Sequence, residues 1–407
     1  MTVGTRAAPG RLIVVKYGGS VLEGGPAIRR AAETLREEQE KGTGLVVVVS
    51  AIKGVTDQLL SAAASISDDT PLDVVDHIIG LGEEQSVRLM ASALRSQGVE
   101  AVEVTPTSPR WPIITDDNYG DAEPLLEECE SSAELGLRPL VDRGSVPVVC
   151  GFVGRSHDGY ITTLGRGGSD TTAVILARCL GADELVLVKD VGGIYSADPK
   201  KVEFARPIEQ LSAWEANLLA SSGAKVLHDK VFRYKPDDLR IRIVSIDQGL
   251  NGSGSVITGT IPEIEVRVHE EPVMSITVLG DLISEPGTLT LIMRAMKAGG
   301  GAVLSVKGDR EVMTLHVEGS PVDLLAGVHS VVESSEHVKA VSGSEGLALI
   351  EVKGRRLHNL AEAIRKIDEG LSSRGIPVKV SSIGPLSLTI LVDWEKRFTA
   401  AKAIEEL

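Results

Sequence analysis

Up to about residue 258, apolar positions in the chain alternate between two patterns. Some segments, such as 26–41, mix charged and apolar residues at the spacing of an amphipathic helix. Others are short apolar runs of the kind found in parallel strands covered on both faces. These runs occupy residues 12–15, 45–49, 146–149, 185–188 and 241–244. Strands separated by helices predict an α/β sandwich around a mainly parallel sheet, with ligands bound at the carboxyl ends of its strands.

The pattern changes near 259–262, after which one order of elements occurs twice: strand, helix, strand, strand, helix. The first copy occupies 274–279, 286–298, 302–306, 312–317 and 321–332, and the second 347–352, 357–374, 378–382, 387–392 and 397–407. This order predicts two small ferredoxin-like α+β units. The second copy ends on its helix, so its fourth strand must be missing or borrowed, with 263–268 as the candidate. We expect domains at 1–262, 263–340 and 341–407.

Composition narrows the class of protein. The 407 residues are 43% hydrophobic, so they can bury a core, and the net charge of −15 argues against nucleic-acid or anionic-membrane partners. Cys129, Cys150 and Cys179 are too few and too irregular for a disulfide framework or a cysteine zinc site. The N-terminus lacks a signal-peptide pattern, and no apolar run approaches ~18 residues. We therefore expect a soluble cytoplasmic protein without a dedicated metal site.

The segment from Thr162 to Asp170 combines three glycines, hydroxyl groups, Arg166 and Asp170 between a strand-like run and a helix-like run. Such a loop presents backbone amides and the positive end of a helix dipole to an anion. Its glycines allow close approach, and a guanidinium can bind a carboxylate through two bonds. The alternative is a glycine-rich turn whose serine and aspartate only cap the helix.

Other strand ends carry similar chemistry. Lys16 precedes Gly18 and Gly19, a combination suited to polyphosphate, although a surface lysine before a turn has the same sequence. Thr56 lies beyond the next strand, where it could equally cap a helix. Glu83, beside two glycines at an expected helix boundary, could pair with a substrate ammonium or be a solvated first-turn glutamate.

The segment 188–200 leaves a further strand and is also open to two interpretations. Asp190, Tyr195 and Lys200 could bind a nucleotide, but a turn rich in Gly, Asp and Pro explains the composition equally well. Lys225 supplies one more cation. Signatures of P-loop, Rossmann and protein-kinase sites are absent from the sequence.

In their order, these segments resemble the amino acid kinase family, and within it the aspartate kinases with tandem ACT regulatory regions. The motifs are Lys-Tyr-Gly-Gly at 16–19, Ser-Ala-x-x-Gly-Val-Thr at 50–56, Gly-Glu at 82–83, Gly-Phe-Val-Gly at 151–154, Thr-Thr-Leu-Gly-Arg-Gly-Gly-Ser-Asp at 162–170, Asp-Val-x-Gly-Ile-Tyr-x-x-Asp-Pro beginning at 190, and Gly-Ala-Lys-Val-Leu-His at 223–228. The resemblance implies a three-layer kinase sandwich followed by two ACT-like units.

The resemblance also implies a reaction: ATP-dependent phosphorylation of the side-chain carboxylate of L-aspartate, with Mg²⁺, as the first step toward lysine, threonine and methionine. By position it implies catalytic roles for Lys16, Arg166 and Asp170. It implies aspartate binding by Thr56, Glu83, Arg166, Gly167, Gly168 and Ser169. It implies ATP binding by Lys16, Tyr17, Gly18, Gly19, Lys189, Asp190, Tyr195, Lys200 and Lys225.

The ACT resemblance implies an amino-acid effector, such as lysine or threonine, bound near Ser284, Gly287 and Thr288, and a homo-oligomer formed through these units. Some positions depart from the family pattern: Lys189 stands where Thr or Ser is common, and Asp229 replaces the usual Pro. Two alternatives remain, a kinase of the same fold acting on another acidic amino acid and an inactive amino-acid sensor. Glu83 favours a substrate with a free ammonium, and retention of Lys16, Arg166 and Asp170 argues against the sensor.

Overall fold

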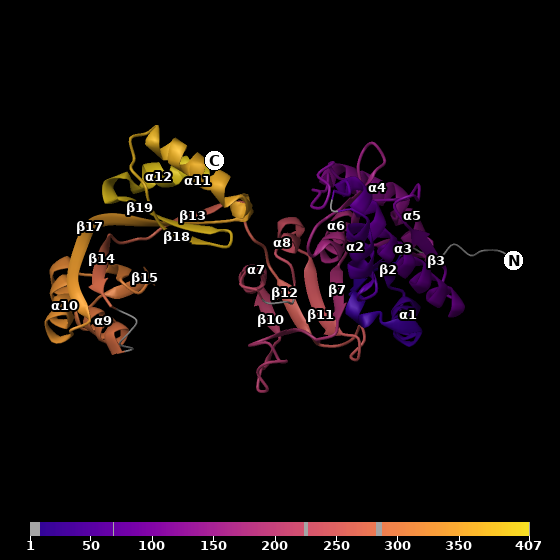
Figure 1. The fold of residues 1–407 in the computed structure, drawn as a ribbon, viewed down its shortest axis with the longest axis horizontal. Coiled ribbons are helices and arrows are strands. Elements are labelled where there is room, and N and C mark those ends of the chain that lie inside the picture. Colours follow the sequence, from indigo (N-terminus) through magenta and orange to yellow (C-terminus); the bar gives the residue numbers. More distant parts are fainter. Residues whose placement is uncertain (1–8, 68, 224–226, 282–286, 407) are drawn as a thin grey trace. The chain divides into compact units, whose positions relative to one another are not determined.

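The structure is a computed structural model that describes residues 9–67, 69–223, 227–281 and 287–406. Contacts divide the chain into two compact units, Met1–Ile261 and Pro262–Leu407 (Figure 1). Each unit is described by itself.

The first unit is built on an eight-stranded sheet in the order β10-β12-β11-β7-β1-β2-β4-β3. Every neighbouring pair is parallel except β11 with β12, and this mainly parallel sheet confirms the predicted α/β class. Its strands are β1 (Leu12–Tyr17), β2 (Gly44–Val49), β3 (Ala101–Val104), β4 (Val146–Cys150), β7 (Glu184–Lys189), β10 (Gln210–Ser212), β11 (Arg240–Ser245) and β12 (Ser255–Thr258). Two short antiparallel pairs accompany it: β5 (Val153–Arg155) with β6 (Ile161–Thr163), and β8 (Ile194–Tyr195) with β9 (Pro207–Ile208).

Helices cover both faces of this sheet. Neighbouring residues of a strand point to opposite sides, so they contact different helices. In β1, the Tyr17 hydroxyl lies 3.0 Å from Thr34 Oγ1 of one helix, whereas Lys16 contacts Asp170 of another. The helices are α1 (Gly24–Glu40), α2 (Val55–Ile66), α3 (Leu72–Ser96), α4 (Leu126–Gly136), α5 (Arg138–Asp142), α6 (Gly168–Cys179), α7 (Ala213–Ser221) and α8 (Lys230–Tyr234), with a 3₁₀ turn at Gly19–Val21.

Two helix boundaries differ from the prediction. Glu83 lies in the middle of the 25-residue α3 and not at a helix boundary, so that prediction was wrong. The flanking Gly82 has a packing role: a Cβ there would lie 3.0 Å from Ala51 Cβ. Helix α6 begins at Gly168, so Asp170 lies in its first turn and not in the loop before it.

The second unit contains a seven-stranded antiparallel sheet whose two halves share one strand. Strand β17 pairs with β14 through its first half and with β19 and β13 through its second half. It is thus the fourth strand of one ferredoxin-like motif and the first of the next. The fourth strand of the second motif is borrowed from β13, as the sequence suggested. The strands are β13 (Glu265–Val268), β14 (Val273–Gly280), β15 (Ala302–Gly308), β16 (Val312–Glu318), β17 (Val338–Lys353), β18 (Lys379–Gly384) and β19 (Ser387–Asp393).

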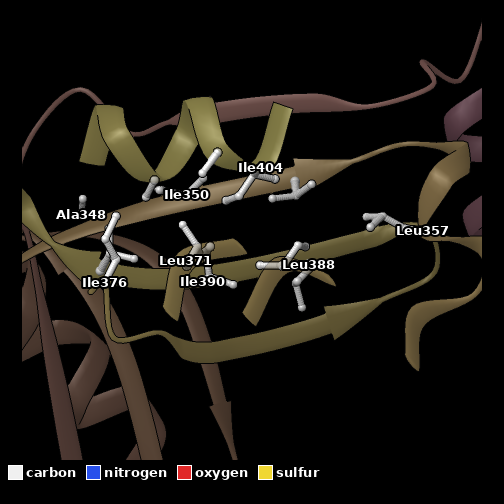
Figure 2. Packing of buried hydrophobic residues seen from close by; sticks show 13 residues of the cluster. Ala348, Ile350, Leu357, Leu371, Ile376, Leu388, Ile390 and Ile404 are labelled. Atoms are coloured by element: carbon white, nitrogen blue, oxygen red, sulfur yellow. The ribbon is translucent and has the colours of Figure 1, made fainter. Parts of the chain in front are cut away.

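Each half of the second unit has its own apolar core and its own pair of helices. In the second half, Ile350 and Ile390 of the sheet meet Leu371 of α11 and Ile404 of α12 in one buried cluster (Figure 2). The helices are α9 (Gly287–Ala298), α10 (Pro321–Ser334), α11 (Leu360–Ser372) and α12 (Arg397–Glu405), with 3₁₀ turns at Arg355–His358 and Trp394–Lys396. Strand β17 runs continuously across the expected domain boundary between residues 340 and 341. That boundary stays a prediction.

Among the helices in the described part of the chain, none is both long enough and apolar enough to cross a membrane.

Candidate active site

A cavity of about 500 Å³ lies beyond the carboxyl ends of β1 and β2. It brings together groups from distant parts of the sequence: a strand end of the parallel sheet, the helices α2 and α3, and the turn between β6 and α6. Of the predicted site residues, it is lined by Lys16, Thr56, Glu83, Arg166, Gly167, Gly168, Ser169 and Asp170. The predicted catalytic and substrate-binding residues therefore share one cavity.

Asp170 lies between two ammonium groups. Its Oδ1 is 2.7 Å from Lys16 Nζ and its Oδ2 is 3.0 Å from Lys189 Nζ, with the Asp170 side chain only 9% exposed. Burial alone would raise the pKa of Asp170, but the two ammonium groups hold it well below its usual range. Burial lowers the pKa of Lys16, and Asp170 opposes that shift. The carboxylate thus stays ionised and holds the buried ammonium of Lys16 and the partly buried ammonium of Lys189 in place.

Glu83 presents a second carboxylate to the same cavity. Its Oε1 accepts a hydrogen bond of 3.2 Å from the Ala51 backbone N–H, whereas its buried Oε2 has no hydrogen-bond partner among the described residues. Burial raises the pKa of Glu83 to about 7. A cation arriving at Oε2 would both satisfy this acceptor and favour the ionised form.

The glycine-rich turn holds Arg166 at the mouth of the cavity. Gly165 and Gly167, on either side of it, have φ values of +70° and +72°, which side chains other than glycine rarely adopt. Arg166 is exposed and forms no ion pair with any residue that the structure describes. Its guanidinium is therefore available to a carboxylate of a ligand.

The turn after β1 is equally constrained. A Cβ on Gly19 would lie 2.2 Å from the Ala51 carbonyl oxygen, so only glycine fits there, whereas a Cβ on Gly18 would meet nothing closer than 3.7 Å. Tyr17 points away from this edge, fully buried against α1, so only its backbone can face a ligand here. If Tyr17 binds ATP, as predicted, it can do so only through its main-chain atoms.

The other predicted nucleotide-binding residues do not line the cavity. Asp190 and Lys200 form an exposed ion pair of 3.2 Å, and Tyr195 is half-buried in β8. Lys189 adjoins them in sequence and reaches Asp170 with its ammonium, so Asp170 connects the cavity with this second group. Lys225 and Ser284 lie outside the described residues. Gly287 begins α9, and the neighbouring Thr288 is buried with no hydrogen-bond partner for its hydroxyl among those residues.

The sequence interpretation missed several residues of the site. Asp76 lies on the cavity wall, where it accepts hydrogen bonds from Gly120 N–H (2.9 Å) and from the N–H and hydroxyl of Thr163 (2.8 and 2.9 Å). Asp76 precedes Glu83 by seven residues, which is two turns along one helix face, and this spacing could have indicated that both carboxylates face the same site. Phe152, also on the wall, has a φ of +69°, and no sequence signal indicated that strained backbone.

Among the described residues, no three His, Cys, Asp or Glu side chains cluster in a way that could hold a metal ion. Asp170 is the carboxylate nearest to the two lysines. With so few protein oxygen donors, a Mg²⁺ ion would fit here only as part of a phosphate-bearing ligand, the arrangement that Mg²⁺ commonly adopts.

Residues 11–245 match the amino acid kinase family. Over 97% of the chain and 96% of each relative, the sequence is 30% identical to an aspartokinase of Bacillus sp. (strain MGA3) and 28% identical to an aspartokinase of Geobacillus stearothermophilus. Escherichia coli aspartokinase III has a similar fold: its complex with aspartate and ADP gives a TM-score of 0.57 at 23% identity, and its complex with lysine and aspartate gives 0.54 at 24%, both covering 97% of this chain and 99% of that one. The chain belongs to the amino acid kinase family, and the two bacterial relatives named above, which it matches over 97% of its length, are aspartokinases.

Proposed function

We propose that this protein is an aspartate kinase, which transfers the terminal phosphoryl group of ATP to the side-chain carboxylate of L-aspartate, giving 4-phospho-L-aspartate and ADP. One observation carries the proposal: Asp170, ion-paired with two lysines, lines the same cavity as Glu83 and Arg166. The full-length match to aspartokinases supports the same reaction.

The attacking group needs no general base. An aspartate side chain has an ordinary pKa near 3.9, so it is already ionised at neutral pH. The remaining tasks are to position the two substrates and to neutralise the negative charge of the transferring phosphoryl group. Lys16, held by Asp170, supplies an ammonium at the strand end, and the Gly18–Gly19 turn lets backbone approach the phosphates. Mg²⁺ bound to the phosphates of ATP would neutralise further charge, with Asp170 as the nearest carboxylate.

Glu83 and Arg166 account for the choice of substrate. Among the described residues, neither Glu83 Oε2 nor the Arg166 guanidinium has a partner, so Oε2 suits the α-ammonium of an amino acid and the guanidinium suits a carboxylate. Thr56 and the backbone of 167–169 line the same cavity and would complete the aspartate site. An N-acylated amino acid has no ammonium for Glu83, so the arrangement disfavours it.

Lys189, Asp190, Tyr195 and Lys200 would bind ATP on the far side of Asp170 from the cavity. This division follows from their exclusion from the cavity lining together with the link from Lys189 to Asp170. The two substrates would then lie on either side of one ion-paired carboxylate.

The second unit would provide regulation. Its two ferredoxin-like halves share β17. The buried hydroxyl of Thr288 at the start of α9, which has no partner among the described residues, would offer a hydrogen-bonding group to an amino-acid effector such as lysine or threonine. Such units would also join copies of the chain into a homo-oligomer. An effector can regulate only by preferring one conformation of the protein.

The reaction is tested with purified protein, ATP, Mg²⁺, L-aspartate and hydroxylamine. An acyl phosphate formed on aspartate is trapped as aspartyl hydroxamate, so we expect hydroxamate with aspartate and none with N-acetylglutamate. Hydroxamate from glutamate but none from aspartate would overturn the substrate. No product with any amino acid would indicate an amino-acid sensor without kinase activity. Repeating the assay with lysine and with threonine tests the regulatory role, and unchanged rates would refute it.

A further inference from the structure

Lys230, the first residue of α8, is a buried cation outside the cavity. Its side chain is 5% exposed, and its ammonium donates to the carbonyl oxygen of Leu164 at 3.0 Å and to Asp121 Oδ1 at 2.9 Å. The Ala122 carbonyl oxygen at 3.5 Å and Glu123 Oε1 at 3.6 Å complete its surroundings. All of these oxygens belong to two segments, the glycine-rich turn and residues 121–123.

The contact with Leu164 is directly next to the turn that carries Arg166. Gly165 follows Leu164, and a Cβ on it would lie 2.2 Å from Asp121 Oδ1, the oxygen that Lys230 also binds. On the other side of Arg166, a Cβ on Gly167 would lie 2.3 Å from the Cβ of His228, two residues before Lys230. The segment 228–230 and Asp121 therefore press against the turn on both sides of Arg166.

A buried ammonium is a costly way to join segments if stability alone is needed, because desolvation offsets much of the gain from its ion pairs. It does fix geometry, since several directed hydrogen bonds converge on one atom. Arg166 has no ion pair of its own with described residues, so the turn must hold it in place.

From these contacts we infer that Lys230 is a positioning residue, which holds the 164–167 turn so that Arg166 faces the substrate carboxylate. The inference rests on the proposed function for the identity of that carboxylate. It makes Lys230 act on aspartate binding through Arg166, with no contact to either substrate.

The test compares Lys230→Met with Lys235→Met. Lys235 is also a buried lysine near α8, and its ammonium binds the backbone carbonyl oxygens of Pro236 (3.0 Å) and Gly259, but it does not line the cavity. In the hydroxamate assay we expect Lys230→Met to raise the KM for aspartate about tenfold, while the KM for ATP stays within about twofold. Lys235→Met should leave both KM values unchanged. Equal effects of Lys230→Met on the two substrates, or none, would overturn the inference.

Two further measurements cover the remaining outcomes. Asp121→Asn changes an exposed side chain, so the variant should fold. It should raise the KM for aspartate about threefold. An unchanged KM decides against the inference even if Lys230→Met does not fold. Trypsin cleavage after Arg166 needs no enzymatic activity and should be faster in Lys230→Met than in the wild type and in Lys235→Met. Equal cleavage rates would refute the positioning role, whereas an inactive wild type would refute only the proposed function.

Discussion

The raised pKa of Glu83 predicts that aspartate binding depends on pH near neutrality. Burial raises this pKa to about 7, and only the ionised carboxylate can pair with the substrate ammonium. The apparent affinity for aspartate is therefore the intrinsic affinity multiplied by the fraction of protein in which Glu83 is ionised. The substrate carboxylate, with an ordinary pKa near 3.9, does not titrate in this range.

The size of the effect follows from the titration. With a pKa of about 7, roughly a tenth of the protein has ionised Glu83 at pH 6 and roughly nine-tenths at pH 8. The KM for aspartate should accordingly fall about tenfold as the pH rises from 6 to 8. The raised pKa also means that the folded state keeps a proton that the unfolded state releases. The contribution of Glu83 to stability should thus decrease by roughly 3 kcal/mol between about pH 4.5 and pH 8, taking 1.36 kcal/mol per pKa unit.

The measurement is the KM for aspartate in the hydroxamate assay at fixed ATP from pH 6 to pH 8. Glu83→Gln keeps the shape of the side chain without the charge, so its KM should be high and independent of pH. Glu84→Gln, a neighbouring carboxylate paired with Arg88 at 2.9 Å, is the matched control and should keep the wild-type profile. A wild-type KM that is constant over this range, or a sloping profile in Glu83→Gln, would refute the reasoning.

Two other predictions concern the strand ends. Asp170→Asn leaves the ammonium groups of Lys16 and Lys189 without their shared carboxylate, so turnover should be lost and stability at pH 7 should fall by about 3–5 kcal/mol. Because the folded pKa of Asp170 is depressed, this stability difference should shrink as the pH falls below about 4, which denaturant titrations can follow. Gly19→Ala should lower the melting temperature and weaken ATP binding, since its Cβ would meet a backbone oxygen at 2.2 Å. Gly18→Ala, with no contact under 3.7 Å, should melt close to the wild type, and equal melting of the two variants would contradict the packing argument.

Sequence patterns predicted the order of elements well but missed how the second unit shares a strand. The stretch 342–346, Ser-Gly-Ser-Glu-Gly, has the composition of a loop, so only 347–352 was expected as a strand. In the structure it continues β17, because β14 pairs with it across Ser342–Ser344. A Cβ on Gly343 would lie 2.1 Å from Met274 Cε, so the end of the Met274 side chain occupies the space beside the glycine. Pairing with a distant strand overrode the local preference of this stretch for a loop. The sequence of a single segment could not indicate that pairing.

The site was predictable where its residues follow parallel strands. Lys16 at the end of β1 and Lys189 at the end of β7 come together because the parallel sheet places strand ends at one edge. The 164–167 turn follows β6, which lies outside that sheet, so its own glycine-rich motif was the signal for it. Helix-borne residues had no such guide: Glu83 was assigned to a helix boundary, and Asp76 was not considered. Lys230 was beyond reach for another reason, since its partners lie 66 and 109 residues away and only the folded chain brings them together.

The charge of the cavity explains how an acidic protein can hold anionic substrates. The chain carries −15 overall, yet Lys16 and Arg166 line the cavity, and Lys189 lies beside it on the other oxygen of Asp170. Asp170 cancels one of these charges, and its ion pairs keep the two lysines from the exposed surface, where water and salt would screen them. Glu83 adds a negative charge only when it is ionised, which a substrate ammonium favours. In the proposed reaction, binding of the substrate ammonium at Glu83 would leave the lysine charges to act on the phosphates of ATP.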